Sequence, residues 1–237
     1  MGDLGSFQSI GCRLSQVRNE ILRTCASCGR SLDSVKLVGV SKFKSIQDIV
    51  EAREFGLLDF GENYAQELRG KCHKLEGVHW HFIGRLQKNK VNDVITSADY
   101  IHSLDSLELI ERVEKSCIAK DRKIKGFLQI HLGGEESKGG IEPQNLLDFC
   151  FDLSKIDLNN LSIVGLMTIP PPCYNAEENR HYFRLLRELK ERVAEKRFPF
   201  WRGNELSMGM SGDFSVAIEE GATFVRVGRA IFGERHA

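Results

Sequence analysis

The feature of this chain that most limits its fold is a repeated alternation of short apolar runs with segments of helical periodicity. The apolar runs, interpreted as strands, cover residues 37–42, 57–60, 78–84, 100–102, 124–132, 161–168, 205–208 and 223–227. Amphipathic helices are expected between them. The chain opens with a helix whose apolar face contains Leu4, Phe7, Leu14, Val17 and Ile21.

This alternation, at intervals too short for separate domains, predicts one α/β domain over residues 1–237, a single (β/α)8 TIM barrel. An open, doubly wound parallel sheet is the alternative fold. No G-x-G-x-x-G motif follows the first strand, which weakens that alternative. No linker-like or low-complexity tract divides the chain.

Charge and cysteine content argue against several classes of function. The 33 Lys and Arg residues balance 33 Asp and Glu residues, so no net field favours nucleic acid or an anionic membrane. No apolar run has the length of a membrane span, and no signal peptide is recognisable. We therefore expect a cytoplasmic protein. The seven cysteines favour reduced thiols, and Cys25 and Cys28 are interpreted as incidental helix residues rather than a zinc or redox pair.

Lys42 is the first candidate functional residue, because it ends the first apolar run. Strand alternation places Val38, Val40 and Lys42 on one face. A lysine at the end of a buried strand loses hydration, which lowers its pKa toward that of a reactive free amine. Such an amine condenses with an aldehyde to form a Schiff base. The alternative is a solvated lysine that extends from the barrel mouth.

Polar residues also follow the last two predicted strands. In a TIM barrel the carboxyl ends of the strands meet at one mouth, and the loops after strands seven and eight commonly bind phosphate. Ser207 and Ser211 offer hydroxyl groups there, and Gly228 allows backbone N–H groups to approach an anion. An equally good interpretation makes Gly228 a tight turn and Ser207 a hydroxyl satisfied within the protein.

Arg226 alternates with Val225 and Val227 in the eighth strand. If both valines face the helices, Arg226 points into the barrel, where an aromatic nitrogen would accept one of its hydrogen bonds. A structural ion pair is the alternative. His79 and His81 share a strand face, but no third ligand stands at a suitable spacing, so no metal site is predicted.

A Schiff-base lysine, a phosphate loop and an arginine suited to a ring nitrogen are together the groups that bind pyridoxal 5′-phosphate (PLP). Over nearly its whole length the sequence resembles the pyridoxal phosphate homeostasis protein family (also called YggS/PROSC), whose fold resembles the N-terminal barrel domain of alanine racemase. The matching motifs are Val40–Lys42, Phe60–Glu67, Trp80–Lys90, Gly165–Thr168, Leu206–Ser211, and Val225–Gly228 with Ala230–Gly233.

The resemblance implies that Lys42 carries PLP as a Schiff base and that Asn63 flanks the ring. It implies that Arg226 faces the pyridine nitrogen, and that Ser207 with the backbone of Gly228 and Arg229 holds the phosphate. Lys138 matches a family lysine thought to take part in cofactor handling. The chain departs from the family pattern at His131, Gly212 and Arg229, and Arg229 removes a side-chain hydroxyl as a phosphate contact.

The resemblance favours a PLP carrier without catalytic residues. An arginine only donates hydrogen bonds, so it keeps the pyridine nitrogen unprotonated and the ring a weaker electron sink. Racemases that resemble this barrel take a second base, a tyrosine, from a C-terminal β-domain, and here only a few residues follow the eighth strand. We expect a role in vitamin B6 homeostasis without strong catalysis, with a PLP-dependent amino-acid racemase of low activity and a lysine aldolase as alternatives. Apo PLP-enzymes and free amino acids are candidate partners, and a monomer is expected.

Overall fold

The computed structural model describes residues 9–133 and 139–234; Leu4, Phe7 and Lys138 lie outside them. Within these residues the strands are β1 (Lys36–Val40), β2 (Asp59–Glu62), β3 (His79–Phe82), β4 (Tyr100–Leu104), β5 (Ile124–Gln129), β6 (Leu161–Met167), β7 (Trp201–Ser207) and β8 (Phe224–Val227). The helices are α1 (Ile10–Ser27), α2 (Ile46–Glu54), α3 (Ala65–Cys72), α4 (Val91–Ser97), α5 (Leu107–Ala119), α6 (Leu146–Leu153), α7 (Arg180–Glu195), α8 (Phe214–Glu219) and α9 (Arg229–Phe232). Each predicted strand is present, although β7 begins four residues earlier than predicted.

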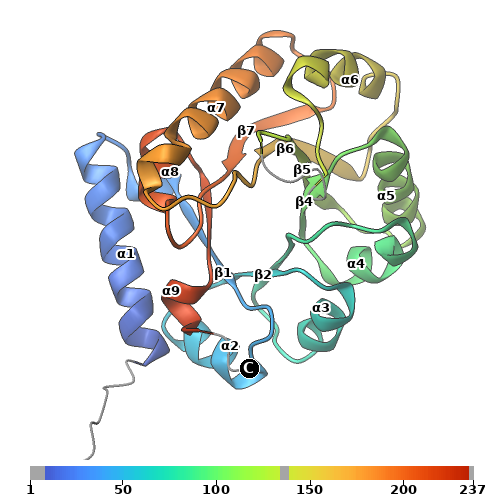
Figure 1. Cartoon of the computed structure of the whole chain (residues 1–237). Coiled ribbons are helices and arrows are strands. Elements are labelled where there is room, and N and C mark those ends of the chain that lie inside the picture. Colours follow the sequence, from blue (N-terminus) through green and yellow to red (C-terminus); the bar gives the residue numbers. More distant parts are fainter. Residues whose placement is uncertain (1–8, 134–138, 235–237) are drawn as a thin grey trace, which may run out of the picture.

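The strands form a closed barrel in sequence order from β1 to β8. β1 closes the ring by pairing in parallel with β8, with Lys36 opposite Phe224 and Gly39 opposite Val227. Figure 1 shows the helices arranged around the strands, with α1 outside α8 and α9. The predicted TIM barrel is confirmed, and the open sheet is wrong. In the part of the chain that the structure describes, no helix combines the length and apolar character needed to cross a membrane.

Alternation along the strands produces an apolar layer on each side of the sheet. Inside the barrel, a cluster contains Val38, Tyr100, Phe127, Val164, Met167 and Phe224. Outside it, a larger cluster lies between strands and helices and includes Val225 and Val227. Since both faces of a parallel sheet are covered, most strand residues are buried, and several of the buried ones are polar. Arg226 lies between these two valines and is itself buried, which confirms the face predicted for it.

The turn between β1 and α2 is short and capped. The Ser45 hydroxyl accepts a hydrogen bond from the Asp48 N–H at 3.1 Å, and the Asp48 carboxylate accepts one from the Ser45 N–H at 2.9 Å. This capping box starts α2 directly behind the end of β1. Gly56, with φ +78°, follows the helix in the left-handed conformation that glycine adopts readily. Lys42 therefore lies in a brief connection between the end of β1 and the capped start of α2.

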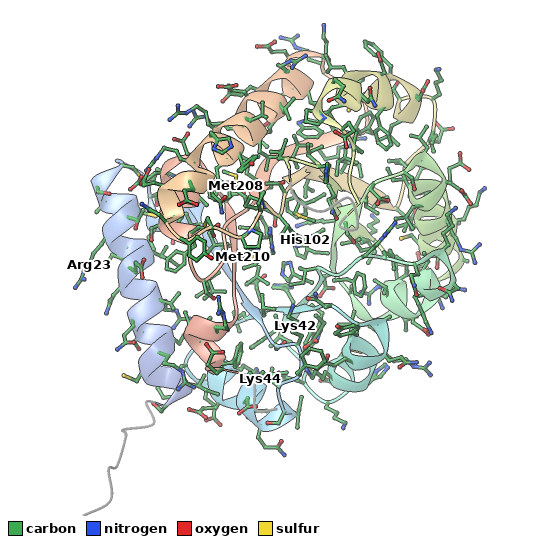
Figure 2. The ribbon with its side chains drawn as sticks, viewed as in Figure 1. Arg23, Lys42, Lys44, His102, Met208 and Met210 are labelled. Atoms are coloured by element: carbon green, nitrogen blue, oxygen red, sulfur yellow. The ribbon has the colours of Figure 1, made fainter. Side chains whose placement is uncertain are left out.

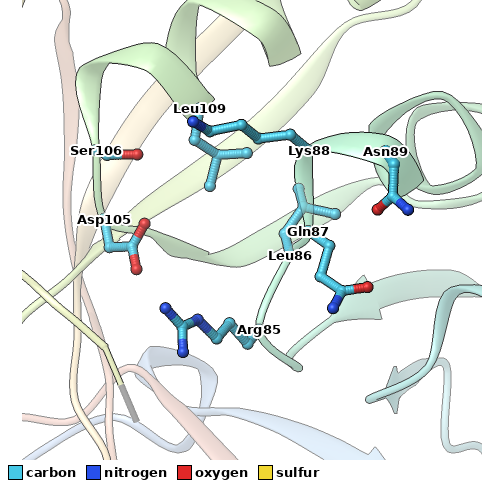
Figure 3. Close-up of a pocket in the computed structure, with 8 residues that line it drawn as sticks. All are labelled: Arg85, Leu86, Gln87, Lys88, Asn89, Asp105, Ser106 and Leu109. Carbon is cyan, nitrogen blue, oxygen red and sulfur yellow. The ribbon is translucent and has the colours of Figure 1, made fainter. Parts of the chain in front are cut away.

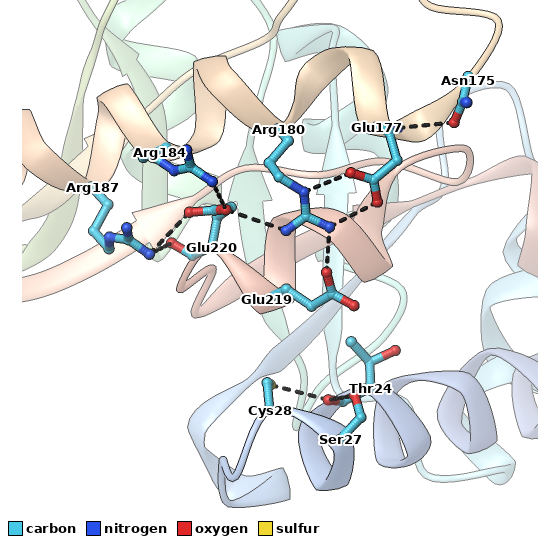
Figure 4. A network of polar contacts seen from close by, with 10 residues as sticks. All are labelled: Thr24, Ser27, Cys28, Asn175, Glu177, Arg180, Arg184, Arg187, Glu219 and Glu220. Atoms are coloured by element: carbon cyan, nitrogen blue, oxygen red, sulfur yellow. Dashed lines mark hydrogen bonds and ion pairs between the residues drawn. The ribbon is translucent and has the colours of Figure 1, made fainter.

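An ion-pair cluster joins α8 to α7 (Figure 4). Glu220, directly after α8, pairs with Arg180 at 3.2 Å and with Arg184 and Arg187 at 3.0 Å each. Burial tends to raise the pKa of Glu220, but the hydrogen bonds and positive charges of the arginines outweigh it and hold this pKa below its usual value. Arg180 also pairs with Glu177 and Glu219. The cluster fixes the helix that follows the loop after β7.

Candidate cofactor site

A cavity of about 420 Å³ opens at the carboxyl ends of β1, β6, β7 and β8. The loop after β6 contributes Pro170–Pro172, Cys173 and Tyr174 to its wall, and the loop after β7 contributes Met210–Asp213. The lining also contains Lys42, Lys44, Asn179, Arg226, Gly228 and Arg229. This is the end of the barrel at which TIM-barrel proteins place their sites.

Lys42 reaches this cavity from the end of β1. Ser41 continues the pairing of β1 by donating its N–H to the Gly61 carbonyl at 3.0 Å. Val38 belongs to the barrel interior, so alternation directs Lys42 to the same side. The Lys42 side chain is half-buried. Figure 2 shows Lys42 and His102 within the ring of helices, whereas Arg23 lies on the outside of α1. The predicted placement of Lys42 at the mouth is confirmed.

The loops after β7 and β8 also line the cavity, and β8 is the strand that pairs with β1. Ser211 Oγ accepts a hydrogen bond from the Gly228 N–H at 3.2 Å and one from the Ala230 N–H at 3.5 Å. Gly228 has a φ of −111°, which other residues also adopt. A Cβ at this position would lie 3.4 Å from Val40, an ordinary contact, so crowding does not require glycine here either. Arg229 is exposed on the same wall, so a hydroxyl, backbone N–H groups and a guanidinium lie close together.

Arg226 projects into the barrel below this wall. Its Nη1 donates to Ser207 Oγ at 2.6 Å, and its Nη2 donates to the Thr168 carbonyl at 2.9 Å. Burial lowers the pKa of Arg226 to about 10, while the nearby Asp213 opposes that change. The guanidinium therefore stays charged at neutral pH. Both of these bonds go to neutral oxygen atoms, rather than to the acidic partner of the alternative interpretation.

A buried chain of hydrogen bonds continues from Ser207 across the barrel. His102 Nδ1 lies 2.8 Å from Ser207 Oγ, and His102 Nε2 lies 3.0 Å from His81 Nδ1. His81 Nε2 in turn lies 2.9 Å from Asp59 Oδ1. Burial lowers the pKa of both histidines, that of His102 well below its usual value. With neutral rings and a carboxylate at the far end, each group donates toward Asp59, beginning with Arg226.

These hydrogen bonds change the interpretation of Ser207 and His81. The Ser207 hydroxyl lies in the interior, bonded to Arg226 and His102, so its contact with a phosphate stays a prediction. His81 is buried in the barrel interior, bonded to His102 and Asp59, and serves no metal site among the residues described. Sequence reasoning missed His102 altogether. The available signal was its position in β4, where alternation turns every second side chain toward the barrel axis.

Asn63 does not line the Lys42 cavity; it lines a different pocket, of about 440 Å³, together with Tyr64 and Arg85. Its Oδ1 atom is buried and has no hydrogen-bond partner among the residues described. The backbone of Asn63 is packed against Gly84, since a Cβ at Gly84 would lie 2.1 Å from the Asn63 carbonyl oxygen. The requirement for glycine within the Trp80–Lys90 motif thus has a steric cause.

The same motif also lines a pocket of about 590 Å³, shown in Figure 3, where Arg85 lies across from Asp105. Burial raises the pKa of Asp105, and the charge of Arg85 opposes that change. Lys138, predicted to handle the cofactor, lies outside the described residues. Within residues 9–133 and 139–234, no three His, Cys, Asp or Glu side chains gather as a metal site would require.

Comparisons with known proteins agree with this geometry. The chain is 42% identical over 228 residues to the pyridoxal phosphate homeostasis protein of Aquifex aeolicus, covering 94% of this chain and 97% of that protein. Identity to the protein of the same name in Escherichia coli K12 is 36% over 234 residues, covering 97% of this chain and 98% of that protein. PipY of Synechococcus elongatus, solved with PLP bound, superposes with a TM-score of 0.83 at 35% identity, covering 95% of this chain and 100% of that one.

More distant proteins share the fold. Alanine racemase of Clostridium difficile superposes with a TM-score of 0.68 at 13% identity, covering 93% of this chain and 60% of that one. The model of the alanine racemase N-terminal domain family matches residues 15–236. The chain therefore belongs to the pyridoxal phosphate homeostasis protein family, which carries the alanine racemase N-terminal domain.

Proposed function

We propose that this protein is a single-domain carrier that binds PLP reversibly as a Schiff base on Lys42 and acts in vitamin B6 homeostasis without strong catalysis of its own. The observation that supports this most is the convergence of Lys42, Arg226 and the Ser211–Gly228 contact on one cavity. PLP brings an aldehyde, a phosphate and a pyridine nitrogen. The cavity offers an amine, a polar loop and a guanidinium, so the residues present fit the cofactor.

Each residue then has a defined part. The Lys42 amine condenses with the aldehyde. Ser211 and the backbone of Gly228 and Arg229 bind the phosphate, and the Arg229 guanidinium supplies charge where the family pattern has a hydroxyl. Arg226 faces the pyridine nitrogen and donates to it. Ser207 contributes by orienting Arg226. Asn63 flanks the ring from the neighbouring pocket, and Lys138 assists cofactor handling.

A carrier accounts for the names of the relatives, which are homeostasis proteins rather than enzymes. A racemase of low activity is the second candidate, and one observation favours it. Tyr174 lines the cavity and is fully exposed. A phenol in that position is a candidate for the second base of racemisation. The partners are PLP itself, apo PLP-enzymes and free amino acids, and the protein acts as a cytoplasmic monomer.

The test combines PLP titration with a lysine substitution. The purified protein is titrated with PLP, followed by its absorbance, then reduced with borohydride and mapped by peptide mass. We expect the label on Lys42 and its loss in Lys42→Ala, while Lys44→Ala, which changes another lysine of the same cavity, keeps it. Labelling of Lys44 in place of Lys42 would contradict the assignment. Turnover of alanine well above that of free PLP would replace the carrier with the racemase, and Tyr174→Phe should then abolish it.

A further inference from the structure

The backbone on both sides of Lys42 is held by charged side chains from α3. Before Lys42, the Ser41 carbonyl accepts a hydrogen bond from Lys71 Nζ at 2.8 Å. After it, the Phe43 N–H donates to Glu67 Oε1 at 2.6 Å. These two groups belong to the peptide units that flank the Lys42 Cα atom. One helix therefore restrains Lys42 from both sides without touching the cavity.

The buried carboxyl group of Glu62, at the end of β2, holds both Ser41 and Lys71 in place. Glu62 is fully buried, and its Oε1 accepts hydrogen bonds from Ser41 Oγ at 2.6 Å and from Lys71 Nζ at 2.9 Å. Lys71 also pairs with Glu67 at 2.6 Å. A buried ammonium thus joins two carboxylates and the end of β1. Burial raises the pKa of Glu62 to about 7, with Lys71 opposing the change, as expected for a carboxyl group kept from water.

The backbone at the next residue is strained. Phe43 has a φ of +62°, a left-handed conformation that a bulky residue rarely adopts. Such a conformation is energetically unfavourable and persists only where surrounding contacts impose it. The bond from the Phe43 N–H to Glu67 is one such contact. The Phe43 ring adds another, because it lies 5.3 Å from the Tyr64 ring between centroids.

We propose that Glu62, Glu67 and Lys71, here called the Lys42 clamp, are positioning residues that fix the backbone of Lys42 so that its amine meets the aldehyde of PLP. This inference rests on the proposed function and adds three residues to it. The clamp lies on the outer side of β1, opposite the cavity, because Ser41 faces outward where Lys42 faces inward. Its members act through the backbone of Lys42 and not on the cofactor.

Docking of α3 alone does not explain these contacts. The helix is already anchored by Ala65 and Leu68, which are buried in the outer apolar cluster. The surface of α3 carries another ion pair, between Arg69 and Asp93 at 3.4 Å. That pair does not involve residues 41–43. Replacing Arg69 is therefore a matched control, because it removes a charge from the same helix and leaves the clamp intact.

The test compares Glu67→Ala, Glu67→Gln and Arg69→Gln with the wild-type chain. Glu67 is the best site to change, because its side chain is 20% exposed and its removal leaves the Glu62–Lys71 pair in place. PLP affinity is measured by titration, labelling of Lys42 by borohydride reduction and peptide mapping, and folding by thermal unfolding. We expect Glu67→Ala to weaken PLP binding about tenfold, as loss of one charged hydrogen bond predicts. Glu67→Gln keeps an acceptor oxygen and restores most of the affinity, and Arg69→Gln binds as the wild type does.

Three other outcomes would overturn the inference, and they differ in what they leave standing. If Glu67→Ala is folded and labels Lys42 with wild-type affinity, the clamp has no positioning role although the proposed function stands. If Glu67→Gln binds as poorly as Glu67→Ala, the acceptor oxygen is not what matters, and positioning is likewise contradicted. If the wild-type chain itself does not label Lys42, the proposed function fails and the clamp is reduced to a structural brace.

Discussion

Arg226, His102 and Glu62 are buried polar residues whose protonation depends on the tertiary structure. Arg226 keeps its charge inside the barrel because its donors find Ser207 and Thr168. His102 stays neutral because burial and the nearby Arg226 disfavour its charged form. Glu62 binds its proton more tightly than in water. The two titrating groups therefore make opposite contributions to the pH dependence of stability.

For His102, the folded state has the lower pKa. Below about pH 6.5 the unfolded chain takes up a proton that the folded chain does not, so this residue makes stability fall as the pH falls. The contribution is about 1.4 kcal/mol per pH unit. We expect His102→Gln to reduce the slope of unfolding free energy against pH by about this amount between pH 5 and 6.5. Urea unfolding at several pH values measures it, and an unchanged slope would show that His102 is charged in the folded protein.

For Glu62, the folded state has the higher pKa, so the sign is reversed. Between about pH 4.5 and 7 the folded chain holds a proton that the unfolded chain has released, and this makes stability fall as the pH rises. We expect Glu62→Gln to make the slope more positive by about 1.4 kcal/mol per pH unit in that window. The same urea series tests this. A slope that moves in the other direction would mean that Glu62 is ionised throughout.

At the scale of elements, α7 and α8 share the arginine–glutamate cluster centred on Glu220. Most surface ion pairs contribute little to stability, because water screens them and long side chains lose entropy. Glu220 differs, since its side chain is 6% exposed and meets three arginines. A buried carboxylate with several charged donors contributes more than an exposed pair. The cluster thus holds α8 behind the loop that carries Ser211.

We expect Glu220→Gln to lower the unfolding free energy at pH 7 by about 1–3 kcal/mol. The pKa of Glu220 is lower in the folded protein than in the unfolded chain. The stabilisation by this carboxylate is therefore fully present above the unfolded pKa, and it is lost as the pH falls through the folded pKa. The difference from the wild type should therefore shrink toward pH 3. Glu177→Gln, which removes a more exposed partner of Arg180, should have a smaller effect. Equal losses for Glu220→Gln at both pH values would contradict the electrostatic origin.

At the scale of the whole molecule, closure of the barrel creates the cofactor site. β1 and β8 are at opposite ends of the chain, yet they pair along their length. Closure brings Lys42, after the first strand, to the cavity that Gly228 lines after the last. Gly228 lies beside Val40 at this junction. The site therefore exists only once the last strand has joined the first.

The sequence by itself determined the alternation of elements, the barrel, the inward direction of Arg226 and the placement of Lys42 at the mouth. These follow from local rules, because strand alternation and helix periodicity are properties of neighbouring residues. The family resemblance was also readable, because its motifs are contiguous. The start of β7 at Trp201 was missed, since the residues before Glu205 alternate between half-buried and exposed positions and form no apolar run.

Only the tertiary structure decided which partners the polar residues have. The series of hydrogen bonds from Arg226 to Asp59 joins β8, β7, β4, β3 and β2. The Lys42 clamp joins α3 to the ends of β1 and β2. No local pattern connects Ser207 with His102, or Lys71 with Ser41. A buried donor or acceptor must find a partner wherever the fold supplies one. The identity of that partner depends on how distant segments pack together.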